Sequence, residues 1–110
     1  MNPEVIEKMI ADGRDSYESR LAAGQARLNN GDVSMAVEHF EKATAFKPGH
    51  TMAWQNLGQA FDQLDRPEDC RAAWQRGLEA ARDNGDVQAE KVLTVWLKRL
   101  DKRLDQAPPA

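Results

Sequence analysis

The chain is 110 residues long, 41% of them hydrophobic and 30% charged, with a net charge of −3. This balance is typical of one small, water-soluble, helix-rich domain, and it disfavours the broad basic surface that nonspecific nucleic-acid binding needs. No apolar run approaches the roughly 20 residues that span a bilayer, and the first residues lack a signal peptide's basic start and apolar centre. The single cysteine, Cys70, cannot form an internal disulfide, so a cytoplasmic protein is expected. The net charge and the lack of long apolar runs predict that it has neither nucleic-acid nor membrane partners.

Start and stop signals for helices recur along the whole chain. Asn2 can cap a first helix that begins at Pro3, Ser16 can cap a second, and Asp32 or Ser34 a third. Most stop signals contain Gly or Pro, and they predict turns near residues 13–15, 30–32, 48–50, 65–67 and 84–86. No segment alternates apolar and polar residues over the length of a strand, so the predicted fold class is all-α, with about six helices.

The tripeptide GQA occurs at 24–26 and again at 58–60, which is 34 residues later. Placing residues 17–50 above residues 51–84 brings the two copies into register. The same alignment pairs small residues with small ones and large aromatic residues with each other: Gly24 with Gly58, Ala36 with Cys70, and Phe40 with Trp74. Matched sizes at matched positions predict two copies of one helix-pair unit.

Helix pairs that repeat every 34 residues resemble the tetratricopeptide repeat family. That family places Trp, Leu, Gly and an aromatic residue in the first helix of a repeat, helix A, and Ala, an aromatic residue, Ala and Pro in or after the second, helix B. Each unit here matches about half of the pattern: the second supplies Trp54, Leu57, Gly58 and Phe61, and the first supplies Ala36, Phe40, Ala43 and Pro48. The resemblance implies that Gly24 and Gly58 let helix A approach helix B closely.

The resemblance also implies a domain organisation, an antiparallel helix-pair α-solenoid over residues 1–105. Its expected parts are an N-terminal half-repeat with Ile6 and Met9 at core positions, repeats at 17–50 and 51–84, and a capping helix at 86–104. Residues 106–110 are expected to form a disordered tail. The capping helix is expected to offer Ala89, Val92, Leu93, Trp96 and Leu100 to the preceding repeat. Its basic residues are expected to face water: Lys91, Lys98, Arg99, Lys102 and Arg103.

Residues that could carry chemistry are few and widely spaced. His39, His50 and Cys70 fit no metal-ligand spacing, and the glycines are expected to be helix stops or packing residues rather than a phosphate loop. Cys70 is expected to be a small core residue. The three tryptophans, Trp54, Trp74 and Trp96, are expected to belong to the core before any binding surface. The sequence therefore predicts no enzyme, no cofactor and no metal site.

The resemblance implies that a peptide or protein segment binds in the concave groove lined by the A helices. The family's groove positions fall on Glu18, Leu21, Gln25 and Leu28 in the first repeat, and on Met52, Gln55, Asn56, Gln59 and Asp62 in the second. The chaperone-binding members of the family hold a carboxylate with a clamp of Lys, Asn and Arg residues. Leu21 and Gln25 replace two of that clamp's residues here and only Asn56 matches, so the acidic tails of heat-shock chaperones are not expected as partners.

An alternative function is structural. The first helix carries an apolar stripe, Val5, Ile6, Met9 and Ile10, that could pair with a second copy and form a homodimer or a larger assembly. The same stripe could instead pack on helix A of the first repeat. The sequence favours the second arrangement but leaves both open.

Overall fold

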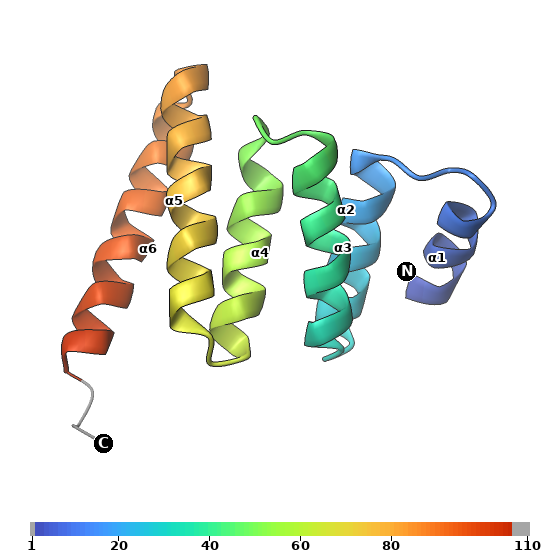
Figure 1. Ribbon diagram of the computed structural model, residues 1–110, viewed down its shortest axis with the longest axis horizontal. Helices are drawn as coiled ribbons and strands as arrows, with labels where there is room; N and C mark the ends of the chain where they lie inside the picture. The colour runs from blue at the N-terminus through green and yellow to red at the C-terminus, as the bar shows by residue number, and fades with distance from the viewer. Residues whose placement is uncertain (1, 107–110) are drawn as a thin grey trace.

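The computed structural model describes residues 2–106, and within that range it contains six helices and no strand. The helices are α1 (Pro3–Ala11), α2 (Tyr17–Asn29), α3 (Val33–Phe46), α4 (Thr51–Gln63), α5 (Pro67–Asn84) and α6 (Val87–Asp105) (Figure 1). The all-α prediction is confirmed, and the chain turns at the five expected places. Of the expected tail, Gln106 is the C-cap of α6 and residues 107–110 lie outside the described part. None of the six helices has the length and apolar character that crossing a membrane requires.

Side-chain caps begin the helices where the sequence predicts them, with one exception. The Asn2 carboxamide oxygen accepts from the Glu4 amide at 2.9 Å, and Asp86 accepts from the Ala89 amide at 3.1 Å. Ser16 forms a capping box with the third residue of α2. Asp32 stands at the N-cap of α3 but makes no capping hydrogen bond, since its carboxylate pairs with Arg27 at 3.0 Å.

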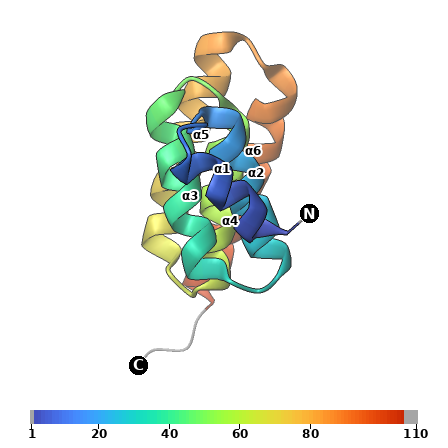
Figure 2. The same cartoon turned by 90° about the vertical axis from the view of Figure 1, so that its right-hand side faces the viewer.

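The helices form antiparallel pairs that stack side by side. α2 packs along α3 and α4 along α5, while contacts of α3 with α4 and of α5 with α6 join the pairs. In Figure 1, α3 and α5 lie toward the viewer with α2 and α6 behind them, and the side view in Figure 2 shows the same two layers. The array measures 46 × 36 × 19 Å, so it is a thin slab. A slab of two helix layers leaves the outer sides of both layers open to solvent.

One glycine sets the close contact inside each of the two helix pairs. A Cβ added to Gly24 would overlap the ring of Phe40, and a Cβ added to Gly58 would overlap the indole of Trp74. The expectation that Gly24 and Gly58 allow helix A to approach helix B is therefore confirmed. The aligned aromatic residues are the partners of the aligned glycines, because the same interhelical contact is built twice.

The main core runs through the second repeat and ends on α6. It contains Phe40, Leu57, Phe61 and Trp74, and α6 closes it with Leu93 and Leu100, both essentially inaccessible. As expected, Val92 and Trp96 are half-buried, Ala89 is buried, and the five basic residues of α6 named above are exposed. The terminal helix thus covers the last repeat with one face and presents charge on the other.

The N-terminal helix α1 packs against α2, as the sequence favours. Ile6 is only 5% exposed and lies against Ala23 and Ala26, with Ile10 beside it. The expectation for Met9 is wrong, because its side chain is 38% exposed. α1 packs along one helix only, α2. The other two residues of the apolar stripe, Val5 and Met9, therefore stay exposed.

An ion cluster ties α1 to the first repeat. Glu7 accepts from Arg27 on α2 at 2.5 and 3.0 Å, and it lies 2.6 Å from Nε2 of His39 on α3. Nδ1 of His39 lies 3.2 Å from Arg20. Because a guanidinium only donates, Nδ1 accepts and Nε2–H donates to Glu7. The Arg27 guanidinium, and to a smaller extent His39, lower the pKa of Glu7 to about 2, although partial burial acts in the opposite direction.

Candidate functional site

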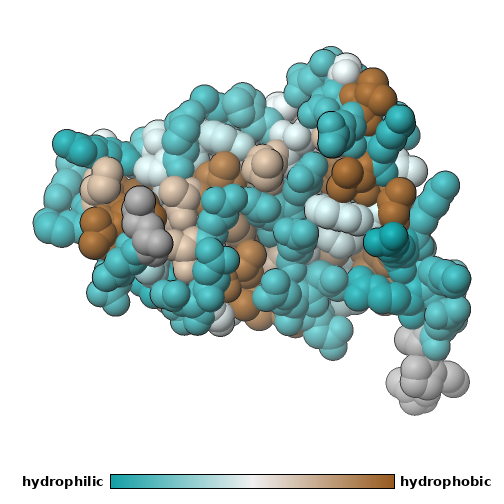
Figure 3. Space-filling model, turned by 180° about the vertical axis from the view of Figure 1, so that it is seen from behind, coloured by the Kyte–Doolittle hydropathy of each residue, from teal (hydrophilic) through white to brown (hydrophobic). Residues whose placement is uncertain are grey.

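The nine residues predicted to line the groove lie on α2 and α4 with different degrees of exposure. Glu18, Gln25 and Met52 are exposed, and the others are half-buried: Leu21, Leu28, Gln55, Asn56, Gln59 and Asp62. Leu21 and Leu28 pack against the main core. Glu18 is paired with Lys47 at 3.0 Å, at the end of α3. Seen from behind, with α2 and α6 toward the viewer, this side of the molecule shows apolar side chains bordered by hydrophilic ones (Figure 3).

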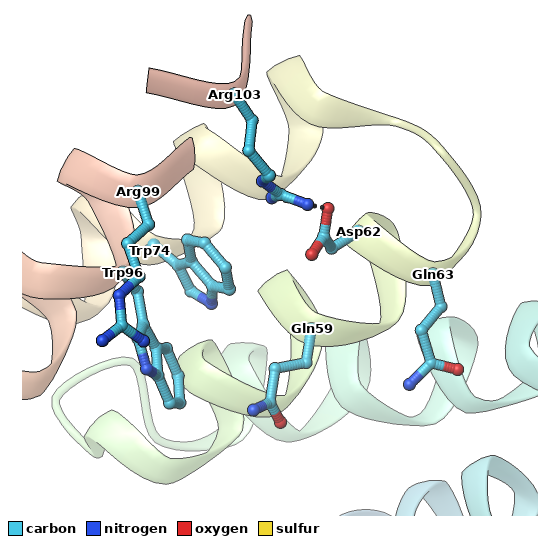
Figure 4. Close-up of a pocket in the computed structure, with 7 residues that line it drawn as sticks. All are labelled: Gln59, Asp62, Gln63, Trp74, Trp96, Arg99 and Arg103. Carbon is cyan, nitrogen blue, oxygen red and sulfur yellow. Dashed lines mark hydrogen bonds and ion pairs between the residues drawn. The ribbon is translucent and has the colours of Figure 1, made fainter. Parts of the chain in front are cut away.

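A hollow of about 460 Å³ lies between α4 and α6. α4 contributes Gln59, Asp62 and Gln63 to its lining, and α5 contributes Trp74. The remaining lining residues come from one face of α6: Trp96, Arg99 and Arg103 (Figure 4). The volume lies at the small end of the range of ligand pockets, so it suits a few side chains rather than a folded domain.

Two indole rings form the apolar part of the hollow. The ring centroids of Trp74 and Trp96 are 5.3 Å apart, with their planes tilted by 46°. Trp74 is 5% exposed, and its indole nitrogen donates to the Gln55 carbonyl oxygen at 3.2 Å, which fixes the ring. Trp96 is half-buried. The expectation that Trp96 packs on the core is therefore confirmed, and the same ring also faces the hollow.

The charged groups divide between two sides of the hollow: Arg103 and Asp62 meet away from Trp96, whereas Arg99 stands on the same side as Trp96 (Figure 4). Arg103 of α6 donates to Asp62 of α4 at 3.0 Å and so bridges the two helices. Arg99 also lines the hollow and has no carboxylate within 4.0 Å among residues 2–106. The lining thus combines two guanidinium groups with one carboxylate.

The structure brings together only part of the predicted site. Gln59 and Asp62 share the hollow, whereas Met52 lies in a separate, smaller depression of about 290 Å³ near Tyr17 and His50. The sequence reasoning missed five lining residues: Gln63, Trp74, Trp96, Arg99 and Arg103. One signal could have found Trp96, which stands 34 residues after Asp62, so it occupies the same groove position in a third unit.

Asn56 occupies an unusual environment one turn before Gln59. Its amide nitrogen is buried and has no hydrogen-bond partner among residues 2–106. A buried polar group without a partner costs about 1–3 kcal/mol, so the position is not optimised for stability. Side chains of this kind are expected at functional sites, where binding competes with stability.

Groups that could carry catalysis or hold a metal are dispersed in the described part. Cys70 is fully buried, and this burial raises the pKa of its thiol to about 12. A thiol in that environment is a packing residue and not a nucleophile. Residues 2–106 contain no cluster of three His, Cys, Asp or Glu side chains arranged to hold a metal ion.

Antiparallel helix pairs in register, with a hollow beside the terminal helix, define a helical-repeat protein of the solenoid class. The family model described as Tetratricopeptide repeat matches residues 17–50. The chain is 37% identical over 99 residues to the TPR repeat-containing protein PA0015 of Pseudomonas aeruginosa, a match that covers 90% of this chain and 94% of that protein. The protein therefore belongs to the tetratricopeptide repeat family.

Solved structures show the same fold. Protein BPP2914 from Bordetella parapertussis is 33% identical and superposes with a TM-score of 0.77, over 92% of this chain and 88% of that one. A tetratricopeptide repeat domain protein from Salinibacter ruber is 23% identical and also gives 0.77, over 87% and 96% of the two chains. The second likeness concerns the fold alone. Repeat proteins of this kind generally present extended surfaces for binding other proteins and are not enzymes.

Proposed function

We propose that the protein binds an extended peptide segment of a partner protein along the side formed by α2, α4 and α6. The observation that carries this proposal is the hollow between α4 and α6, where Gln59 and Gln63 line one wall and Trp96 the other. An amide side chain both donates and accepts hydrogen bonds, so it can pair with the peptide groups of an extended chain. Indole rings add a large, rigid apolar contact.

The other predicted groove residues give the bound segment a path along α4. Met52 precedes Asp62 by ten residues on the same helix, which corresponds to about 15 Å at 1.5 Å per residue. An extended segment rises by about 3.3 Å per residue, so roughly five residues would span this distance. Short segments of this length are what a groove made by two repeats and a capping helix can hold.

Selection from a random dodecapeptide library tests the proposal. The wild-type protein is expected to enrich a family of related sequences, and Gln25→Glu with Gln59→Glu is expected to weaken binding of the enriched peptides about tenfold. Glutamate keeps helix propensity, so the fold should be preserved. Gln75→Glu with Gln88→Glu is the matched control, because both glutamines are exposed and lie outside the hollow. Binding that survives the first pair undiminished would exclude the groove.

Self-association is a second candidate, supported by the exposed side of α1. Val5 is 55% exposed, and Met9 lies one turn later on the same side. Ile6 and Ile10 pack within the molecule, so changing them would test folding rather than association. Val5→Ser with Met9→Ser leaves that packing intact and should convert a dimer to a monomer in sedimentation equilibrium. A wild-type protein that sediments as a monomer at high micromolar concentration would rule this candidate out.

A further inference from the structure

The hollow between α4 and α6 contains more unused hydrogen-bond donors than acceptors on its α6 side. Trp96, Arg99 and Arg103 follow one another at intervals of three and four residues, so they share one face of the helix. Arg103 is engaged with Asp62, the one carboxylate among the lining residues of the described chain. Arg99 has no ion-pair partner in residues 2–106. One positive charge in the hollow is therefore not neutralised.

The three indole N–H groups of the protein also differ in whether they have a hydrogen-bond acceptor. Trp54 donates to the Pro48 carbonyl oxygen at 2.8 Å, and Trp74 donates to that of Gln55 at 3.2 Å. The Trp96 N–H has no acceptor within the described chain, and it is not among the side-chain atoms that are both buried and unpaired. This N–H is therefore available to an acceptor outside the described chain.

We infer that the hollow binds a carboxylate side chain of the partner segment, and that an apolar side chain next to it packs on the Trp74 and Trp96 rings. This inference rests on the proposed function and specifies the partner as an acidic peptide with an adjacent apolar residue. Arg99 supplies the charge-assisted hydrogen bonds, which are the strongest that a guanidinium makes. The N–H of Trp96 supplies a further donor beside the Arg99 guanidinium. Asp62 holds Arg103 in place across the hollow.

The charges of the hollow favour a peptide over a nucleic acid. A strand of nucleic acid needs a row of cations along its phosphates, whereas two arginines line this hollow and one of them is already paired. The protein as a whole has a net charge of −3. The cations also come from the capping helix and not from the clamp positions of the chaperone-binding relatives, two of which are Leu21 and Gln25 here.

Selections from the random dodecapeptide library on three proteins provide the test. On the wild type, enriched peptides should contain Asp or Glu beside Leu, Phe or Trp. Arg99→Gln with Arg103→Gln should lose the acidic preference, whereas Lys98→Gln with Lys102→Gln should keep it. The lysine pair removes the same charge from the same helix, but both lysines are exposed and outside the hollow. Loss of the acidic preference in both double variants would mean that the peptides bind by general electrostatic attraction, and it would overturn the inference.

An enriched peptide, amidated at its C-terminus so that only side chains supply carboxylates, gives a second readout. Its affinity for the Arg99→Gln, Arg103→Gln double variant should be about tenfold lower than for the wild type, which corresponds to the loss of one charge-assisted hydrogen bond. Asp62→Asn should raise the affinity by freeing Arg103. In nitrogen–proton correlation spectra the indole resonance of Trp96 should move more than those of Trp54 and Trp74.

The outcomes separate the inference from the proposed function. Enriched peptides that lack acidic residues, but whose binding is lost in the Gln25→Glu and Gln59→Glu protein, would overturn the inference alone. A library that yields no enriched family on the wild type would overturn the proposed function as well. A single-stranded oligonucleotide that binds more tightly than every selected peptide, and depends on Arg99 and Arg103, would replace the peptide with a nucleic acid.

Discussion

Gly58 on α4 and Trp74 on α5 lie so close that a methyl group on Gly58 would occupy the space of the indole ring. The ring cannot easily yield, because it is buried and its nitrogen is bonded to the Gln55 carbonyl oxygen. Gly24 and Phe40 form the same contact in the first repeat. The distance between the two helices of each pair is therefore set by a glycine against an aromatic ring.

Replacing Gly58 with alanine should destabilise the protein more than replacing Gly77 with alanine. Gly58→Ala forces the Trp74 ring to move and should cost about 1–3 kcal/mol. A Cβ at Gly77 would lie 3.0 Å from the Trp54 Cβ and 3.2 Å from a methyl carbon of Leu93, which can shift. For Gly77→Ala, the gain in helix propensity from alanine, up to about 1 kcal/mol, offsets part of the cost of these close contacts. Thermal unfolding followed by circular dichroism measures both, and equal melting temperatures would contradict this account.

The Glu7 cluster should make stability depend on pH in the acid range. The pKa of Glu7 is about 2 in the folded protein against an ordinary value of 4.5, chiefly because of Arg27. A carboxyl whose folded pKa is lowered stabilises the fold above the unfolded pKa, and this contribution disappears as the pH falls from about 4.5 to about 2. Glu7→Gln should lower stability at pH 7 by about 1–2 kcal/mol, after allowance for solvent screening, and should flatten its decline in that window.

Urea unfolding at several pH values between 2 and 7 measures this effect. Glu4→Gln is the matched control, because Glu4 is an exposed carboxyl on the same helix with no ion pair in the described part of the chain. The free energy of unfolding of the Glu4→Gln control should lie within about 0.5 kcal/mol of the wild-type value. If Glu7→Gln and Glu4→Gln gave the same pH profile, the cluster would not anchor α1.

Asn56→Leu should leave the protein as stable as the wild type or more stable. Leucine has a similar size and removes the buried amide nitrogen that has no partner among residues 2–106. The gain is expected to be about 1 kcal/mol, with Gln75→Leu on an exposed face as the control for helix propensity. If Asn56 belongs to the groove, as the sequence predicts, the same change should weaken binding of library-selected peptides. Destabilisation beyond about 1 kcal/mol would show that the amide is satisfied in solution.

Cys70 should resist thiol reagents while the protein is folded. Its side chain is inaccessible, and burial raises the pKa of its thiol to about 12, so the thiol is protonated at neutral pH. At pH 8 a disulfide reagent should react at least about a hundredfold more slowly with the native protein than with protein in guanidinium, because reaction requires opening of the helix pairs. A fast stoichiometric reaction in native buffer would mean that Cys70 is exposed in solution.

Much of the fold could be predicted from local features of the sequence. The caps at Asn2, Ser16 and Asp86 and the glycine and proline stops depend on a few neighbouring residues, so they mark the six helices without knowledge of the rest. The register of Gly24 with Gly58 and of Phe40 with Trp74 also identifies the contacts between helices, because a repeated contact leaves a repeated pair in the sequence. Asp32 failed as a capping residue because a charge outside its own helix, Arg27, takes its carboxylate.

The candidate hollow could be predicted only in part, because it depends on how two helices from different units are spaced. Gln59 and Asp62 follow from the groove positions of the family, but Arg99 and Arg103 look like solvated charges on a terminal helix. They face the hollow because α6 packs on α5 through Leu93 and Leu100, and this packing fixes its rotation. The ion cluster of Glu7, Arg27 and His39 joins three helices up to 32 residues apart. Sequence periodicity determines which face of a helix is buried, whereas the polar groups that meet across helices are decided by the packing of those faces in three dimensions.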